Sequence, residues 1–517
     1  MKKYNYISVI AILVLLTGSV SCSKWLDVRS SDEIIESEAF KETEGFRTAL
    51  IGIYRQVASP DLWGRELSWG LTSNLANNFA YASSDPAYRP ALNATADPYV
   101  NSTIRVHIDA VWAKAYNTIA NINELLDKIE SRDPSEFEVS FEKDVIMGEA
   151  RGLRGLLHFT LLSLYRPAPV TGYNGEALPY VTTYPDYQPV TKQWDEYVKL
   201  MLDDIKESEK LLYHYDVEEG RNGAVFQVGA NNMQNMDYYL YQNAGAWRND
   251  GAVRDNAANA FGFFATRGYR YNWWSANALL ARVYSYLRDF DNAEKYADVI
   301  LDNWVNANNF FLDTSTADPA SNPNLLDAKR RPEQLLAFYN KNVSANWKSA
   351  ASTSYYKTQN PATLYDDKND YRLTRLLTAV SGTNVFSRVW EPTAAGYSTN
   401  TNVEKHSRNL IPVIELPEMY FIKAECLAQK GNIEDALKEM KAVRDARQCL
   451  VVKTAADLAS FTDQLVLEAE REFFARGTAF QFLKKLNYPT VYNGAAVRKT
   501  LIDGWYVLPI PDAETNF

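Results

Sequence analysis

Reactive and metal-binding side chains are scarce in this sequence. Its 517 residues include three cysteines and four histidines. The histidines, at positions 107, 158, 214 and 406, are too scattered to form a pair with metal-ligand spacing. The chain also lacks the Gly-x-Ser-x-Gly, Gly-x-Gly-x-x-Gly and Cys-x-x-Cys motifs. We therefore predict no catalytic residue, no metal site and no cofactor.

A surplus of positive charge is also missing. Lysine and arginine number 54 against 64 aspartates and glutamates, so the formal net charge is -10. Nucleic-acid binding depends on cations that neutralise phosphates, and this balance argues against a nucleic-acid partner. With 46% hydrophobic and 23% charged residues, the composition is that of a globular protein.

Long apolar runs are confined to the first residues. Lys2 and Lys3 precede an apolar stretch at residues 7–16, and small residues then lead to Cys22. The stretch is too short to span a bilayer comfortably, so residues 1–21 are predicted to be a signal peptide. The small residue directly before Cys22 resembles the lipobox of bacterial lipoproteins, which predicts an exported chain acylated at Cys22. The alternative is an ordinary signal peptide with an incidental cysteine.

Two further cysteines, Cys426 and Cys449, remain after the predicted cleavage. Two cysteines do not make a disulfide framework, and Cys426 lies within an amphipathic helical pattern. We predict buried free thiols, with a disulfide between them as the alternative.

Helical periodicity dominates the rest of the chain, and strand signals are few and short. Apolar residues recur at spacings of three and four in residues 40–57, 104–129, 145–165, 194–213, 273–303, 415–447 and 456–485. Between them lie polar stretches, and loops of such length usually carry function. We therefore predict one domain, residues 22–517, with ligand-binding insertions at 59–103, 214–271 and 306–403.

Two of the helical segments repeat one another. Their shared spacing is Ala281-x2-Tyr284-x5-Phe290-x2-Ala293 and Ala424-x2-Leu427-x5-Ile433-x2-Ala436. Small residues twelve apart let two antiparallel helices close up, as in a tetratricopeptide repeat. Because one such pair cannot bury its own apolar face, further helices must stack on it. The predicted fold class is all-α, a tetratricopeptide-repeat-like scaffold with long irregular loop insertions.

Three glycines, Gly148, Gly152 and Gly155, share one face of a predicted helix. Each costs a helix interior about 1 kcal/mol relative to alanine, which predicts that another helix approaches this face closely. A phosphate-binding loop is the alternative, but the strand and the Gly-Lys-Ser/Thr ending that it requires are missing.

Clusters of acidic residues have simpler explanations than catalysis. The turn at residues 366–370 lacks the glycine and the distal glutamate of a calcium loop, so it is predicted to be a solvated turn, with a weak metal site as the alternative. Glu468, Glu470, Arg471 and Glu472 are predicted to form solvated helix faces and ion pairs. No carboxylate pair is singled out for glycosidase chemistry.

Aromatic residues are abundant, with 33 tyrosines, 22 phenylalanines and 12 tryptophans. Some lie in polar loops beside asparagines, a mixture that suits carbohydrate because a flat ring can stack on a sugar while amides bond its hydroxyls. Burial against the scaffold is the alternative for any single ring. Trp347, flanked by Asn346 and Lys348, is predicted to be exposed. The candidate glycan-binding residues are Trp63, Trp69, Asn74, Asn77, Tyr81, Trp247 and Trp347.

The chain carries a series of short motifs at residues 23–28, 115–117 with Asn121 and Asn123, 149–159, 370–373, 411–414, 418–425, 431–432, 436–437, 443–444, 470–474 and 508–511. In the order of these motifs, the chain resembles the SusD/RagB family of outer-membrane glycan-binding lipoproteins. Gly152, Gly155 and residues 477–480 depart from the family pattern. The family's glycan-contacting residues vary with the glycan, so none is carried over.

The resemblance implies a cell-surface lipoprotein of the outer membrane, without enzymatic activity. Such a protein would capture an oligosaccharide or polysaccharide and deliver it to a TonB-dependent SusC-like transporter. Two alternatives remain: a surface scaffold that binds protein or peptide, whose mark would be a groove lined by the repeat helices themselves, and a glycoside hydrolase.

Overall fold

The computed structural model describes residues 40–79, 85–138, 141–219, 263, 270–305, 312, 329–330, 333–351, 356, 358–381, 384–390 and 409–515. The chain divides into two compact units, one that ends at Phe46 and one that comprises residues 47–517. The surfaces discussed below lie in the larger unit.

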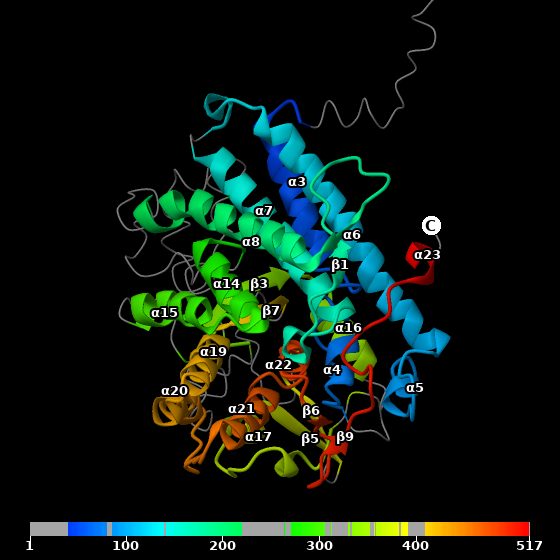
Figure 1. Cartoon of the computed structure of the whole chain (residues 1–517), viewed down its shortest axis with the longest axis vertical. Coiled ribbons are helices and arrows are strands. Elements are labelled where there is room, and N and C mark those ends of the chain that lie inside the picture. The colour runs from blue at the N-terminus through cyan, green and yellow to red at the C-terminus, as the bar shows by residue number, and fades with distance from the viewer. Residues whose placement is uncertain are drawn as a thin grey trace, which may run out of the picture. The chain divides into compact units, whose positions relative to one another are not determined.

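Long helices form the scaffold, as the periodicity predicted (Figure 1). α8 has the predicted bounds, and each predicted segment beyond residue 270 is a pair of helices. The long helices are α3 (Thr43–Val57), α6 (Ser102–Glu130), α7 (Glu142–Tyr165), α8 (Trp194–Tyr213), α14 (Trp273–Leu287), α15 (Phe290–Val305), α19 (Leu416–Gln429), α20 (Ile433–Ala446), α21 (Leu458–Glu472) and α22 (Thr478–Lys485). The predicted helical fold with loop insertions is confirmed.

Short elements lie between the long helices. The short helices are α4 (Leu71–Leu75), α5 (Arg89–Leu92), α16 (Val343–Ala351), α17 (Tyr371–Thr374) and α23 (Asp512–Thr515). The strands are β1 (Glu176–Pro179), β2 (Thr191–Gln193), β3 (Gln334–Tyr339), β4 (Thr358–Gln359), β5 (Leu377–Ser381), β6 (Asn384–Ser387), β7 (Leu410–Glu415), β8 (Thr490–Val491) and β9 (Lys499–Thr500). They pair antiparallel as β1-β2, β3-β7, β4-β6-β5 and β8-β9.

Helices that follow one another in the chain pack against each other. α6 contacts α7, α7 contacts α8, and α8 contacts α14. α14, α15, α19 and α20 then continue the stack in chain order along one side of the molecule (Figure 1). Each added helix covers the apolar face that its predecessor exposes, which is how repeat scaffolds build a continuous core.

The repeated spacing marks the two hairpins α14/α15 and α19/α20. Its four alanines are fully buried: Ala281, Ala293, Ala424 and Ala436. Each hairpin turns through a left-handed residue, Arg288 with φ 65° and Gly431 with φ 86°. The predicted helix pairs are therefore confirmed, and only the second uses glycine where this backbone conformation favours it.

The glycine face of α7 packs against α8. An added Cβ at Gly148 would lie 2.7 Å from Leu212 Cγ, and one at Gly155 would lie 2.5 Å from Ile205 Cγ1. At Gly152 it would lie 2.1 Å from Tyr271 Cε1. The predicted close approach of another helix is confirmed.

Buried ion pairs join the C-terminal helices, and here the expectation of solvated charges is wrong. Glu472 Oε1 lies 2.7 Å from Arg447 Nη2 and 2.8 Å from Arg330 Nη2, and its Oε2 lies 2.8 Å from Arg372 Nη1. Glu468 Oε1 lies 2.6 Å from Arg372 Nη2. α21 contacts α19, α20 and α22, so its charged faces have no access to water. All four charges predicted to be solvated are buried: Glu468, Glu470, Arg471 and Glu472.

The acidic turn at residues 366–370 is solvated only in part, because Asp366, Lys368 and Asn369 are exposed whereas Asp367 and Asp370 are buried. Asp370 is fully buried, caps α17 and pairs with Arg372 at 2.7 Å. Asp367 accepts hydrogen bonds from the backbone N–H groups of Leu450 and Val451. These oxygens already have protein partners, and no cluster with metal-ligand character occurs among the described residues.

Cys426 and Cys449 are buried and free, as predicted. Burial raises the pKa of Cys426 to about 12.

In the described parts of the chain, no helix combines the length and apolarity needed to cross a membrane.

Candidate functional site

The predicted glycan-binding residues that the structure describes are buried. Trp63, Trp69, Asn74, Asn77 and Trp347 each expose 3% or less of their surface. Cys22, Tyr81 and Trp247 lie outside the described residues, as does the predicted signal peptide. The five buried side chains therefore present no ring or amide to a ligand in this structure.

Four rings form an aromatic cluster: Trp69, Phe79, Trp347 and Tyr356. The centroid of Trp69 lies 5.3 Å from those of Trp347 and Tyr356, and Phe79 lies 5.0 Å from Tyr356. The Trp69 contacts are edge-to-face, an arrangement that stabilises aromatic pairs beyond the area that they bury. The loop at 59–103 and the segment at 343–356 are thus held together by their rings.

Trp347 corrects a specific prediction, because it is not exposed. It lies in α16 and is fully buried, while Asn346 and Lys348 are exposed. Successive residues in a helix point about 100° apart, so polar neighbours do not imply an exposed ring. The polar flanks belong to the other faces of α16.

The predicted asparagines bond to the backbone. Asn74 Nδ2 donates to the carbonyl of Gly70 at 2.8 Å, and Asn77 Nδ2 donates to the carbonyl of Tyr492 at 2.7 Å. Asn78, from the same stretch, accepts a hydrogen bond from the N–H of Ala475. Asn74 therefore stabilises the loop itself, whereas Asn77 and Asn78 hold the loop against the C-terminal part of the chain.

A polar cluster borders the aromatic rings, and we name it the Glu66 cluster: Arg65, Glu66, Tyr88 and His107. Glu66 is buried, and its Oε1 lies 2.7 Å from Arg65 Nε and 2.9 Å from His107 Nδ1. Its Oε2 accepts hydrogen bonds from the hydroxyl of Tyr88 at 2.7 Å and the N–H of Leu71 at 3.1 Å. The carboxylate thereby holds Arg65 and His107, whose side chains are 34% and 20% exposed.

Electrostatics keep Glu66 ionised. Burial favours its protonated form, but the hydrogen bond from His107 and the charge of Arg65 outweigh burial and lower the pKa of the carboxyl. Asp85 connects this cluster to the rings, because it accepts a hydrogen bond from Tyr356 at 2.8 Å and its carbonyl accepts the N–H of Tyr88.

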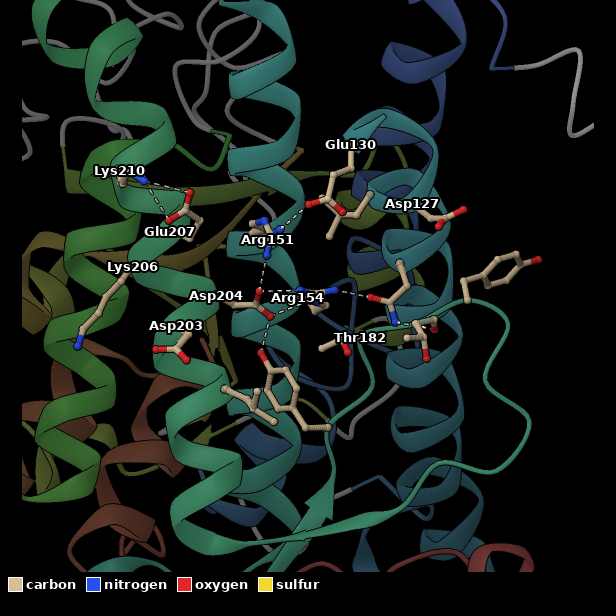
Figure 2. A pocket seen from close by; sticks show the side chains of 16 residues that line it. Asp127, Glu130, Arg151, Arg154, Thr182, Asp203, Asp204, Lys206, Glu207 and Lys210 are labelled. Atoms are coloured by element: carbon tan, nitrogen blue, oxygen red, sulfur yellow. Dashed lines mark hydrogen bonds and ion pairs between the residues drawn. The ribbon is translucent and has the colours of Figure 1, made fainter. Parts of the chain in front are cut away.

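A groove of about 800 Å³ runs over α7 between α6 and α8 (Figure 2). α7 contributes Arg151 and Arg154 to it, one helical turn apart. Asp127 and Glu130 lie on the α6 wall, also one turn apart. Residues 180–184, which follow β1, complete the lining.

The floor of the groove is a buried hydrogen-bond network. Arg154 donates to both carboxylate oxygens of Asp204, from Nε at 2.7 Å and from Nη2 at 2.6 Å. Tyr180 donates its hydroxyl proton to Asp204, and Arg154 Nη1 donates to Asn123 Oδ1 at 2.7 Å. Asn123 in turn donates to the carbonyls of residues 181 and 183. Helices α6, α7 and α8 and the 180–184 loop are therefore fixed relative to one another.

His158 lies below this floor and is stacked on Tyr180, with 3.8 Å between ring centroids. It is fully buried, and burial lowers its pKa to about 3. The ring is therefore neutral at physiological pH and supports the groove from within the protein.

The groove was not predicted from the sequence. Residues 148–159 stood out for their glycines and for the family resemblance, and the same segment contains Arg151 and Arg154. The alternation of these arginines with glycines was the signal in the sequence that could have indicated the groove. Because the glycines share one face of α7, the arginines lie on another face. Asp204 lies in α8, and its partnership with Arg154 depends on the packing of two helices.

The comparisons agree with this architecture. Residues 24–215 match a SusD-like family model whose description reads "Starch-binding associating with outer membrane". Both the Glu66 cluster and the groove fall largely within that range. Comparison with curated proteins gives no match.

Several solved structures have the same fold. A SusD superfamily protein from Bacteroides thetaiotaomicron is 18% identical, with a TM-score of 0.60 over 92% of this chain and 98% of that one. A SusD-like carbohydrate binding protein from Bacteroides vulgatus is 15% identical, with a TM-score of 0.60 over 92% and 96%. A SusD-like protein from Bacteroides fragilis is 14% identical, with a TM-score of 0.59 over 93% and 97%. At these identities the likeness establishes the fold. Together with the family match at residues 24–215, it confirms the resemblance to the SusD/RagB family that was found in the sequence.

Proposed function

We propose that this protein is a cell-surface lipoprotein that binds an oligosaccharide or polysaccharide and delivers it to a TonB-dependent SusC-like transporter. The observation that carries this proposal is the match of residues 24–215 to a starch-binding, outer-membrane-associated family, on a chain with the SusD fold. Binding and transfer need no bond cleavage, so the protein is proposed to act without catalysis. Acylation at Cys22 would tether it to the membrane.

The glycan is proposed to contact the Glu66 cluster. Arg65 and His107 are partly exposed and are held in place by a buried carboxylate, so little conformational freedom would be lost on binding. Arginine and imidazole nitrogens can bond sugar hydroxyls. Tyr81 and Trp247 remain the proposed stacking rings, because a site of this kind needs a flat apolar surface beside its polar groups.

A glycan array followed by calorimetry tests the binding proposal. We expect the purified chain to bind at least one neutral glycan, and Arg65→Ala and Trp247→Ala to weaken that binding about tenfold each. Asn117→Ala, an exposed change further along α6, serves as the matched control and should bind like the wild type. If no glycan on the array binds, the proposed cargo is wrong. If both variants bind the glycan normally, the proposed site is wrong.

Two further measurements address delivery and catalysis. A SusC-like transporter encoded beside this gene should co-purify with the chain, and removal of that transporter should abolish glycan uptake by cells. Incubation of the chain with the bound glycan should release no shorter products. Turnover that disappears on mutation of one carboxylate would instead identify a glycoside hydrolase.

A further inference from the structure

We propose that the groove over α7 is a second glycan site, which holds a neutral stretch of the bound oligosaccharide by its hydroxyl groups. The inference rests on the proposed function for the nature of the cargo, but it concerns a different surface. His107 and Asn123 are sixteen residues apart on α6, so the Glu66 cluster and the groove are separated by about 24 Å along the helix. Short sugars would therefore occupy the two sites independently.

Most charges of the groove are paired within the protein, whereas Lys206 lies over the ring of Tyr284, 5.7 Å from its centroid. On the α6 wall, Asp127 lies 3.5 Å from Lys128 and Glu130 lies 3.8 Å from Arg151. On the α8 wall, Lys199 pairs with Asp203 at 2.5 Å and Lys210 with Glu207 at 3.5 Å. A charged ligand would have to compete with these pairs, whereas a neutral hydroxylated ligand would not. The pairing therefore favours a neutral sugar over a uronate or a charged peptide.

Hydrogen-bonding capacity remains after the charges are paired. Arg151 reaches Asp204 at 3.4 Å through Nη1, and among the described residues its buried Nε has no hydrogen-bond partner. A buried N–H without a partner is costly, so a ligand hydroxyl at this atom would remove an existing penalty. Sugar hydroxyls both donate and accept, which suits a surface that offers carboxylate oxygens beside this guanidinium.

The groove also offers an aromatic ring and a rigid base. Tyr184 lines the groove and is 37% exposed, so its ring can stack on the apolar face of a sugar. The floor network of Arg154, Asp204 and Tyr180 is buried and needs no rearrangement on binding. A volume of about 800 Å³ falls in the range typical of small-ligand sites.

The same groove has the feature expected of a peptide-binding scaffold, because it is lined by scaffold helices. Repeat proteins often use such surfaces for protein partners. The internal pairing of its charges argues against that use, since peptide recognition of this kind usually relies on uncompensated charge. Peptide binding is therefore an outcome that the experiment must distinguish.

The test counts binding sites by calorimetry with neutral trisaccharides, namely maltotriose, cellotriose, xylotriose and mannotriose. We expect the wild-type chain to bind two molecules of one of them. Tyr184→Ala and Arg151→Ala should each weaken one site by about tenfold or more and leave the other unchanged. Tyr187→Ala, 88% exposed on the same loop, and Lys192→Ala are the matched controls and should retain both sites. Trigalacturonate should not occupy the groove.

The contrary outcomes separate this inference from the proposed function. Calorimetry that finds a single site, lost in Arg65→Ala and unaffected by Tyr184→Ala, would show that the groove does not bind sugar. The proposed function would then still hold. No binding of any trisaccharide or array glycan would overturn both. A Lys-containing hexapeptide that binds in a Tyr184-dependent manner, when no sugar does, would reassign the groove to a protein partner.

Discussion

Trp347 is the ring that joins α16 to the loop at residues 59–103. Its centroid lies 5.3 Å from those of Trp69 and Tyr356 and 6.2 Å from that of Phe79. Its role at the residue scale is therefore to stabilise the segment that carries the Glu66 cluster.

Truncation of this ring should lower stability. We expect Trp347→Ala to reduce the free energy of unfolding by about 3–5 kcal/mol, because it removes a buried indole and leaves a cavity. Urea denaturation followed by circular dichroism measures the change. Tyr187→Ala, which removes an exposed ring, should change stability by less than about 0.5 kcal/mol. Equal stability of Trp347→Ala and the wild type would show that the ring is not packed as described.

His158 gives the fold a pH dependence of its own. Burial lowers its folded-state pKa from 6.5 to about 3. In the unfolded chain the ring takes up a proton below pH 6.5, whereas in the folded chain it does not, so stability falls as the pH falls from 6.5 towards 3. Between pH 7 and pH 5 this one group should account for a loss of about 2 kcal/mol.

Denaturation curves at pH 7, 6 and 5 measure this slope, above the range in which ordinary carboxylates titrate. His158→Gln should flatten it, whatever its effect on stability at pH 7. Asn117→Ala, an exposed change that removes no titratable group, should keep the wild-type slope. An unchanged slope in His158→Gln would be contrary to a buried neutral ring.

At the scale of elements, α7 and α8 pack closely because the face of α7 that meets α8 carries glycines, which have no side chain. Gly152 faces Tyr271 and Ser208, and an added Cβ would come within 2.1 Å of the ring. Gly52 in α3 has nothing within 4 Å of the same position. Substitution by alanine should therefore have opposite effects on stability at these two glycines.

We expect Gly152→Ala to destabilise the protein by about 1–3 kcal/mol, because the overpacked methyl group must displace a buried ring. Gly52→Ala should stabilise it by up to about 1 kcal/mol, since alanine is the better helix former and meets no obstacle. Thermal unfolding of the two variants, side by side with the wild type, measures both signs. A stabilising Gly152→Ala would be contrary to the close approach of the Tyr271 ring and of Ser208 in α8.

At the scale of the whole molecule, buried ion pairs connect parts of the chain that are far apart in sequence. Glu472 binds arginines from three segments, Arg330, Arg372 and Arg447. Burial opposes its ionisation, but the charges of these arginines outweigh burial and hold its pKa well below the usual value. Such a network specifies which segments meet, although it adds little net stability compared with an apolar core.

Removal of one charge from this network should be severe. Glu472→Gln leaves buried guanidinium groups without their shared carboxylate, so we expect a loss of about 3–5 kcal/mol in unfolding free energy. Lys441→Ala, which breaks an exposed pair with Asp445, should cost no more than about 1 kcal/mol. Chemical denaturation measures both, and similar small losses would indicate that water reaches Glu472.

Features that depend on residues close together in the sequence could be predicted, whereas features that depend on distant residues could not. The bounds of α8 and the glycine face of α7 follow from spacings of three and four residues, and the two hairpins follow from small residues twelve apart; all of these spacings are local. The burial of Trp347 and Glu472 does not follow from such spacings. It depends on contacts of α16 and α21 with segments that are distant in the chain. The same holds for the site: Arg151 and Arg154 lay in a recognised segment, but their partner Asp204 comes from another helix.

The sequence by itself determined that this chain builds helices, pairs them at residues 273–303 and 415–447, and follows the SusD-like order of motifs, because periodicity and small-residue spacing act within one or two elements. Only the tertiary structure decided which of its many rings and charges reach the surface. Packing placed Trp69, Trp347 and Glu468 inside and left Arg65, Arg151 and Tyr184 at the surface, since burial is a property of what covers a side chain and not of its neighbours in sequence.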